Sequence, residues 1–262
     1  MPLLANCRSP FAHLAWDDEP SGFHRGPKLV VISLIAFATA AGLPVLAEDP
    51  HSSIRSREVI VRQTPALERS LEATDLALGS PAFIRIFKEE HELEVWLEKG
   101  DQFELFRTWE ICTWSGELGP KLEEGDGQSP EGFYYVTPRR LNPWSRFHLS
   151  FDLGFPNGFD RHYRRTGSAL MVHGSCVSIG CYAMTDDSIE EIWTIVDRAL
   201  RGGQPFVRVH VFPFRMTTES LARHREDEWI QFWQNLAEGY QLFEQNKVPP
   251  NVEVRSGRYV FD

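Results

Sequence analysis

The chain has 262 residues, of which 42% are hydrophobic and 24% charged, so a globular core of ordinary size is available. The formal net charge is −10. An acidic chain argues against a nucleic acid as partner, because binding a phosphate backbone requires clustered lysine and arginine side chains. It excludes neither small molecules nor peptides as substrates.

The first 47 residues have the organisation of a secretory signal peptide. Arg25 and Lys28 precede an apolar run over residues 29–41, and a small-residue cleavage site at 45–47 is followed by a polar segment. The run is shorter than the roughly 20 residues of a membrane span. We therefore expect cleavage after Ala47, export to the periplasm or cell envelope, and no membrane span in the mature chain. An uncleaved anchor or a buried helix is the alternative.

The segment that follows the signal peptide predicts a linker and a short helix over residues 48–80. Residues 48–64 are mostly polar, whereas residues 66–78 have the apolar spacing of a helix and end at a Gly-Ser-Pro sequence. From residue 82 the apolar residues alternate instead. Strands are predicted at 83–88, 93–97 and 103–109, with short turns between them, which is typical of an antiparallel meander.

The second half of the chain predicts strands and helices together. A loop rich in Gly and acidic residues covers 117–132, and short strands are expected at 133–137, 168–172 and 206–212. A helix is expected to begin at Thr185 and end at Gly202, and another to cover 218–245. The predicted fold class is α+β, mainly β, with one domain over 81–216 and a helix and tail packed on it over 217–262.

The segment from Met171 to Cys181 carries one histidine, two serines and two cysteines. A thiol becomes a good nucleophile as the thiolate, and a nearby imidazole or helix N-terminus lowers its pKa. Cys181 lies just before the helix predicted at Thr185, and a tight loop could bring His173 close to it. Gly180 would let the backbone approach a substrate closely, and backbone N–H groups there could hold an oxyanion. The segment thus favours a reactive cysteine with a histidine base.

Two other interpretations of the same segment remain open. After signal removal three cysteines are left, so at least one of them lies outside any intramolecular disulfide. A Cys176–Cys181 disulfide would block the nucleophile and leave a non-catalytic wall-binding or envelope scaffold module. His173 and both cysteines could instead hold zinc, although a fourth ligand is needed and the spacing fits no common zinc pattern. Cys112 is expected to be buried in a strand and inert.

The stretch Ser178-Ile179-Gly180-Cys181, preceded by His173-Gly174, resembles the active-site signature of the L,D-transpeptidases with a YkuD-type catalytic domain. The resemblance extends to the YafK-like branch of that family. Separated motifs that fit the branch lie at residues 119–121, 124–128, 130–132, 155–157 and 210–214, so the resemblance covers roughly residues 80–245.

The resemblance implies a sandwich- or barrel-like β domain with the cysteine at the mouth of a groove. It also implies thiolate attack on the amide that follows the L-centre of a diamino acid in a peptidoglycan stem peptide, and transfer of the acyl group to an amine or to water. Carried over by position, Cys181 is the nucleophile and His173 the general base, while Gly174, Ser178 and Gly180 shape the turn and the oxyanion site. No metal or diffusible cofactor is implied.

The chain departs from most of the family in ways that match the YafK-like branch. Ile179 stands where most members have a second histidine, Ala183 stands where most have an arginine, and the spacing from His to Cys is shorter. Members of this branch include enzymes that release a lipoprotein from peptidoglycan rather than attach it. The implied partners are therefore stem peptides and a wall-linked lipoprotein, and the direction of the reaction is left open.

Three cationic side chains are weak candidates for binding the carboxylates of a stem peptide. Lys121 lies in the Gly-rich acidic loop, and Arg164 and Arg165 lie on the approach to the strand that delivers the candidate histidine. A solvated loop lysine and a solvated arginine face are the alternative explanations.

Overall fold

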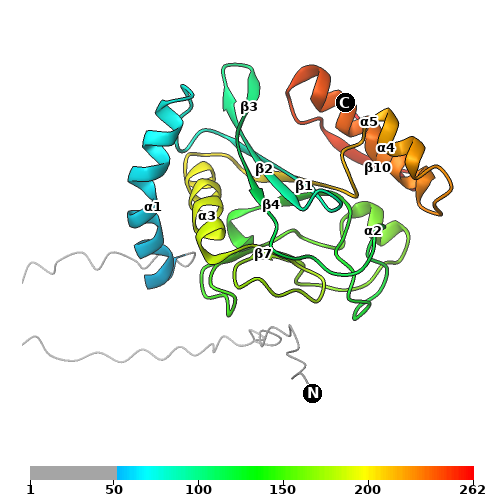
Figure 1. Cartoon of the computed structure of the whole chain (residues 1–262), viewed down its shortest axis with the longest axis horizontal. Helices are drawn as coiled ribbons and strands as arrows, with labels where there is room; N and C mark the ends of the chain where they lie inside the picture. The colour runs from blue at the N-terminus through cyan, green and yellow to red at the C-terminus, as the bar shows by residue number, and fades with distance from the viewer. Residues whose placement is uncertain (1–51) are drawn as a thin grey trace, which may run out of the picture. The chain divides into compact units, whose positions relative to one another are not determined.

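The computed structural model describes residues 52–262 (Figure 1). The predicted signal peptide and the first residues of the predicted linker lie outside the described residues. Within the described part, no helix is long and apolar enough to span a membrane.

A five-stranded sheet forms the centre of the fold. The predicted meander is present as three antiparallel strands, β1 (Ala82–Phe87), β2 (Glu92–Lys99) and β3 (Gln102–Glu110). β9 (Val207–Phe212) pairs in parallel with β1, and β4 (Gly132–Val136) pairs antiparallel with β9. The strand order is therefore β3-β2-β1-β9-β4.

A smaller sheet carries the segment with the histidine and cysteines. Its order is β5 (Leu141–Asn142), β6 (Ser150–Asp152), β7 (Met171–His173) and β8 (Tyr182–Ala183). β7 and β8 are parallel, while the other pairs are antiparallel. The α+β class is confirmed. The two sheets are separate and do not close into the barrel that the resemblance allowed.

Helices cover both faces of the large sheet (Figure 1). α3 (Asp186–Arg201) begins as predicted, because the Thr185 side chain accepts a hydrogen bond from the Ser188 N–H. Along β1, Ile84 and Ile86 face α3, whereas Phe87 packs against α5 (Ile230–Asn246). Alternate side chains of β1 therefore belong to two different hydrophobic cores. The remaining short helices are α2 (Gly158–His162), α4 (Thr218–Arg223) and the 3₁₀ turn η1 (Pro138–Arg140).

Helix α1 (Ile54–Glu72) begins well before the predicted start near residue 66. Ser53 caps it, and Val59, Leu67 and Leu71 are buried in the core shared with α3. In its first half one of the two buried residues is the polar Ser56, while the apolar Ile54 and Val61 are exposed, so this half has no regular apolar spacing. Residues 54–64, predicted as linker, are therefore helix.

Helix α1 also contacts the chain segment 143–148. The Ser53 hydroxyl donates to the Pro143 carbonyl at 2.8 Å, and the Arg55 guanidinium donates to the His148 carbonyl at 2.7 Å. Farther along, Gln63 donates to the Glu190 carboxylate on α3 at 2.8 Å. The helix is therefore tied to the domain by polar as well as apolar contacts.

The C-terminal region is more divided than predicted. The helix expected over 218–245 is interrupted, since α4 ends at Arg223 and α5 begins at Ile230. The tail forms a hairpin of β10 (Val252–Arg255) and β11 (Arg258–Phe261), and Tyr259 packs in the core beneath α5. Trp233 and Leu236 of α5 share one hydrophobic core with Phe212 of β9.

Candidate active site

His173 and Cys181 are delivered by adjacent parallel strands of the small sheet. His173 is the last residue of β7, and β8 begins immediately after Cys181. The strand register places His173 opposite Ala183, two residues beyond the cysteine. Both residues are buried, with 2% of His173 and 5% of Cys181 exposed. The two residues singled out from the sequence therefore lie on adjacent parallel chain segments, two register positions apart.

The His173 imidazole is held in one orientation. Its Nδ1 lies 2.6 Å from the Gly174 carbonyl oxygen. A carbonyl can only accept, so Nδ1 carries the proton and Nε2 of the neutral ring keeps a lone pair. The ring packs on Phe147, with 4.7 Å between ring centroids. Burial lowers the pKa of His173, although the Gly174 carbonyl opposes this. The neutral ring is therefore favoured, as a proton acceptor requires.

The backbone around Cys181 is held by two serine hydroxyls. The carbonyl oxygen of Cys181 accepts from Ser178 Oγ at 2.7 Å and from Ser129 Oγ at 3.1 Å. The Gly180 N–H donates to Ser178 Oγ at 3.2 Å, so it takes part in the turn. Gly180 has a φ of 140°, which an L side chain rarely adopts. The cysteine Sγ lies 3.7 Å from the Ala169 carbonyl oxygen.

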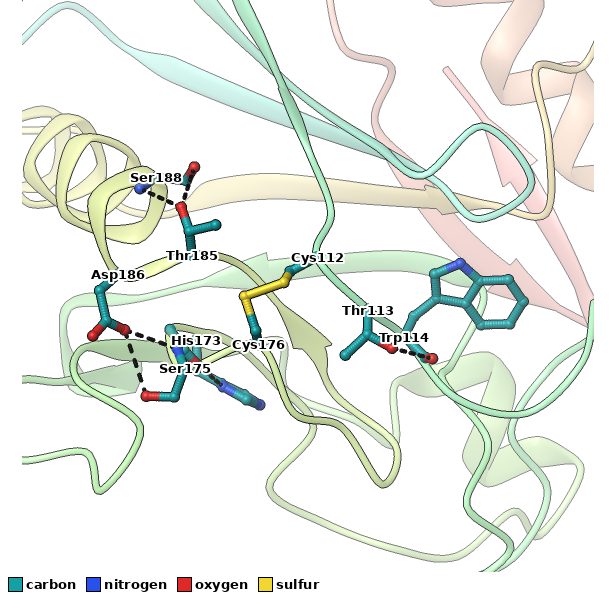
Figure 2. The surroundings of a disulfide bond; sticks show 10 residues. Cys112, Thr113, Trp114, His173, Ser175, Cys176, Thr185, Asp186 and Ser188 are labelled. Atoms are coloured by element: carbon teal, nitrogen blue, oxygen red, sulfur yellow. Dashed lines mark hydrogen bonds between the residues drawn. A yellow bond between two sulfur atoms is a disulfide. The ribbon is translucent and has the colours of Figure 1, made fainter.

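The disulfide of the described chain joins Cys112 to Cys176, which corrects two expectations (Figure 2). The Cys176–Cys181 disulfide is not formed, and the Cys181 thiol lies outside the disulfide. Cys112 is neither in a strand nor buried, because it follows the end of β3 on an exposed stretch. The zinc interpretation also fails for Cys176, whose sulfur is bonded to another sulfur. With the alternative disulfide excluded, the argument for a scaffold module loses its basis.

The loop between His173 and Cys181 is tied to its surroundings at several points. The Ser175 N–H donates to the Asp186 carboxylate at 2.8 Å, and the Cys176 N–H donates to the Met184 carbonyl at 3.2 Å. A Cβ on Gly174 would lie 2.5 Å from the Asp186 carboxylate, so the loop needs glycine there. Figure 2 shows the bond between Ser175 and Asp186 near the disulfide, next to the start of α3. Loop, disulfide and helix start therefore form one rigid unit.

The three weak candidates for substrate binding have different surroundings. Lys121 is only 4% exposed and forms an ion pair with Asp126, so it is not the solvated lysine considered as an alternative. Arg165 is buried and pairs with Asp160 at 2.8 Å. Arg164 is exposed to solvent. Lys121 and Arg165 thus have structural partners of their own.

Sequence reasoning missed the residues that support the site from outside the 171–181 segment. Ser129 reaches the cysteine turn from the Gly-rich loop and Ser115 from the residues just before that loop, and Phe147 covers the histidine. Ser129 directly precedes the Pro130-Glu131-Gly132 motif. That motif indicated a loop and a family resemblance, but it did not indicate that Ser129 contacts Cys181. Contacts over such sequence distances leave no local pattern.

Comparison with known proteins identifies the class. Residues 81–211, half of the chain, match the family described as the L,D-transpeptidase catalytic domain, YkuD. The chain therefore belongs to this family, a class of enzymes that act on peptidoglycan.

The particular relatives lie in one branch of the family. The chain is 48% identical over 191 residues to "Putative L,D-transpeptidase YafK" of Escherichia coli K12, covering 73% of this chain and 78% of the relative. The protein of that name from Escherichia coli O157:H7 matches equally well.

Solved structures with lower similarity were also found. One is the helical cell shape determining protein Pgp2 of Campylobacter jejuni, with 17% identity, a TM-score of 0.41 and coverage of 71% of this chain and 79% of that chain. Another is Bd1075 of Bdellovibrio bacteriovorus, with 17% identity, a TM-score of 0.37 and coverage of 68% and 78%.

Proposed function

We propose that this protein is an exported, cysteine-dependent enzyme that acts at the diamino acid of peptidoglycan stem peptides through an acyl-Cys181 intermediate. The observation that supports it most directly is the placement of two buried residues at adjacent strands, with His173 at the end of β7 and Cys181 directly before β8. The Nδ1 of His173 is engaged by the Gly174 carbonyl, which leaves Nε2 as the atom that would take the thiol proton. Membership of the L,D-transpeptidase catalytic domain family supports the substrate class.

The proposed reaction has two steps. His173 takes the proton of the Cys181 thiol, and the thiolate attacks the carbonyl carbon of the amide that follows the L-centre of the diamino acid. Sulfur–carbon bond formation and carbon–nitrogen bond cleavage give a thioester, and the imidazolium returns its proton to the leaving amine. An amine or a water molecule then attacks the thioester and releases Cys181. Gly174, Ser178 and Gly180 shape the turn that carries the nucleophile.

Export is proposed from the sequence of residues 1–47 together with the disulfide. A Cys112–Cys176 bond persists in an oxidising compartment such as the periplasm, whereas reducing cytosol would open it. The signal-like leader and the oxidised pair thus point to the same location by different arguments. The periplasm is also where peptidoglycan is accessible.

The acyl acceptor decides between two outcomes. Transfer to an amine would create a cross-link or attach a wall-linked lipoprotein, and transfer to water would release one. Ile179 and Ala183 support the second outcome, because they match the branch whose members include lipoprotein-releasing enzymes.

The proposal is tested by incubating the mature, disulfide-intact protein with purified peptidoglycan that carries bound lipoprotein, followed by mass analysis of the muropeptides. New links between diamino acids would indicate transfer, and loss of the bound peptide would indicate hydrolysis. Cys181→Ala should abolish either product while keeping the Cys112–Cys176 bond and the melting temperature. Full turnover by Cys181→Ala would refute the acyl-cysteine route.

A further inference from the structure

We propose that Ser129 is a positioning residue for the nucleophile: its hydroxyl, fixed from the large sheet by Lys88, sets the direction of the Cys181 side chain. The inference rests on the proposed role of Cys181 and adds a residue outside the segment that carries it. Ser129 lies 52 residues before the cysteine in the chain.

Ser129 is fully buried, with 0% of its surface exposed, and its polar atoms are engaged. Its hydroxyl donates to the Cys181 carbonyl at 3.1 Å and accepts from the Ser115 N–H at 3.1 Å. Its own N–H donates to the Ser115 carbonyl at 2.9 Å. Bound on both sides, the hydroxyl has one orientation available, and that orientation points its proton at the cysteine carbonyl.

The loop that carries Ser129 is fixed by a buried cation. Lys88 directly follows β1 and is completely buried. Its Nζ donates to the Ser129 carbonyl at 3.0 Å, to the carbonyls of Glu117 and Gly119 at 2.9 Å each, and to the Glu131 carboxylate at 2.9 Å. Several charge-assisted bonds to one nitrogen hold two parts of the loop at set distances from the sheet. Lys88 therefore fixes the position of Ser129 relative to the end of β1.

The Cys181 carbonyl controls where the thiol points. A peptide unit is planar, so holding the carbonyl oxygen of Cys181 holds the peptide plane from which its Cα extends. Because the turn on the other side of Cys181 is held by the bond from the Gly180 N–H to Ser178 Oγ, the direction of the Cα–Cβ bond is restricted from both sides. β8 begins at the next residue and already fixes the far side of that peptide. Ser178 donates to the same oxygen at 2.7 Å, so two donors from different parts of the chain act on one atom. Small misplacements of reacting atoms cost large factors in rate.

The experiment compares Ser129→Ala, Ser178→Ala and the double variant with Ser220→Ala. Ser220 is a matched control, because it is a buried serine in the first turn of α4 whose hydroxyl contacts Thr217 and Arg223. Two assays are made on the disulfide-intact protein. One measures the rate of Cys181 alkylation by iodoacetamide across pH, and the other measures kcat and KM on peptidoglycan. The alkylation rate needs no knowledge of the substrate.

Ser129→Ala should lower kcat about tenfold, which corresponds to about 1.4 kcal/mol in the activation free energy, with KM unchanged, since the misplacement acts on the nucleophile and not on substrate binding. It should also shift the pH profile of alkylation, which a merely structural role would not do. The double variant should lose more than the product of the single losses, because in each single variant the remaining serine still holds the carbonyl in part. Ser129→Thr, which keeps the hydroxyl, should recover most of the loss.

The proposal is overturned if Ser129→Ala keeps the alkylation profile and the kcat of the unaltered protein, whether or not it melts at a lower temperature, as Ser220→Ala is expected to do. It is also overturned if the two serine substitutions are strictly additive. Should the unaltered protein show no turnover while Ser129→Ala still shifts the alkylation profile, Ser129 keeps its positioning role and the peptidoglycan substrate is rejected. The two proposals can therefore fail separately.

Discussion

Opening the Cys112–Cys176 disulfide is expected to lower the stability of the folded domain substantially. The bond closes a loop over a sequence separation of 64 residues. In the chain-entropy description, a closed loop of that length removes unfolded-state entropy worth about 4 kcal/mol at 25 °C. For a domain of about 200 residues, this corresponds to a fall in melting temperature of about 8–16 °C.

The measurement is a thermal melt of Cys181→Ala with and without dithiothreitol. Removing the third thiol prevents disulfide exchange, so reduction changes only the Cys112–Cys176 bond. The double substitution Cys112→Ser and Cys176→Ser, in the same background, is the control and should melt at the reduced temperature under both conditions. Serine is tolerated at both positions because Cys112 is exposed and Cys176 is half-buried.

Equal melting temperatures for the oxidised and reduced Cys181→Ala protein would refute this reasoning. So would peptide mapping without reductant that links Cys181, rather than Cys112, to Cys176 in the unaltered protein. The second result would also restore the idea that the nucleophile is blocked by its neighbour.

Three further predictions concern the site and its support. The acid limb of the pH profile of kcat/KM should have an apparent pKa below the ordinary imidazole value of 6.5. Burial lowers the pKa of His173, and activity is lost only when the ring is protonated. An apparent pKa above 6.5 would contradict this. Gly174→Ala should cost about 1–3 kcal/mol in urea unfolding, since the new methyl group would overlap the Asp186 carboxylate, and an unchanged midpoint would show that the loop can move aside. Glu131→Gln should destabilise the fold by about 3–5 kcal/mol in the same assay, because it leaves the charge of Lys88 buried without its counter-ion; a cost below 1 kcal/mol would show that the three carbonyls suffice.

The sequence predicted those parts of the fold whose signals are local. The alternation around Ile84 and Phe87 predicted the meander, and the acids that follow Thr185 predicted the start of α3. His173 and Cys181 were found because they lie eight residues apart within a single segment between a strand and a helix. Each of these signals can be read within one window of the chain.

The parts that were missed depend on contacts between distant segments or on a turn that was overlooked. Nothing near Cys112 indicates that its partner is Cys176, because the pairing is made by the fold. The C-terminal hairpin did have a local signal in the Ser256-Gly257 pair, which follows the alternating apolar residues Val252 and Val254. Both residues of the pair have positive φ, as a two-residue hairpin turn requires. The sequence prediction instead gave the residues after the helix at 218–245 as a tail without strands.

Helix α1 shows that similarity and folding can place the edge of a domain at different residues. The family match begins at residue 81, after α1 has ended. A chain trimmed there would uncover the apolar side of α3 where Val59 and Leu67 now pack, and would leave the segment 143–148 without the side chains of Ser53 and Arg55. That segment includes Phe147, whose ring packs on the His173 ring. Trimming would therefore weaken the packing that holds the His173 ring, although the removed residues do not contact it. The smallest piece expected to be both soluble and active therefore begins ahead of Ser53.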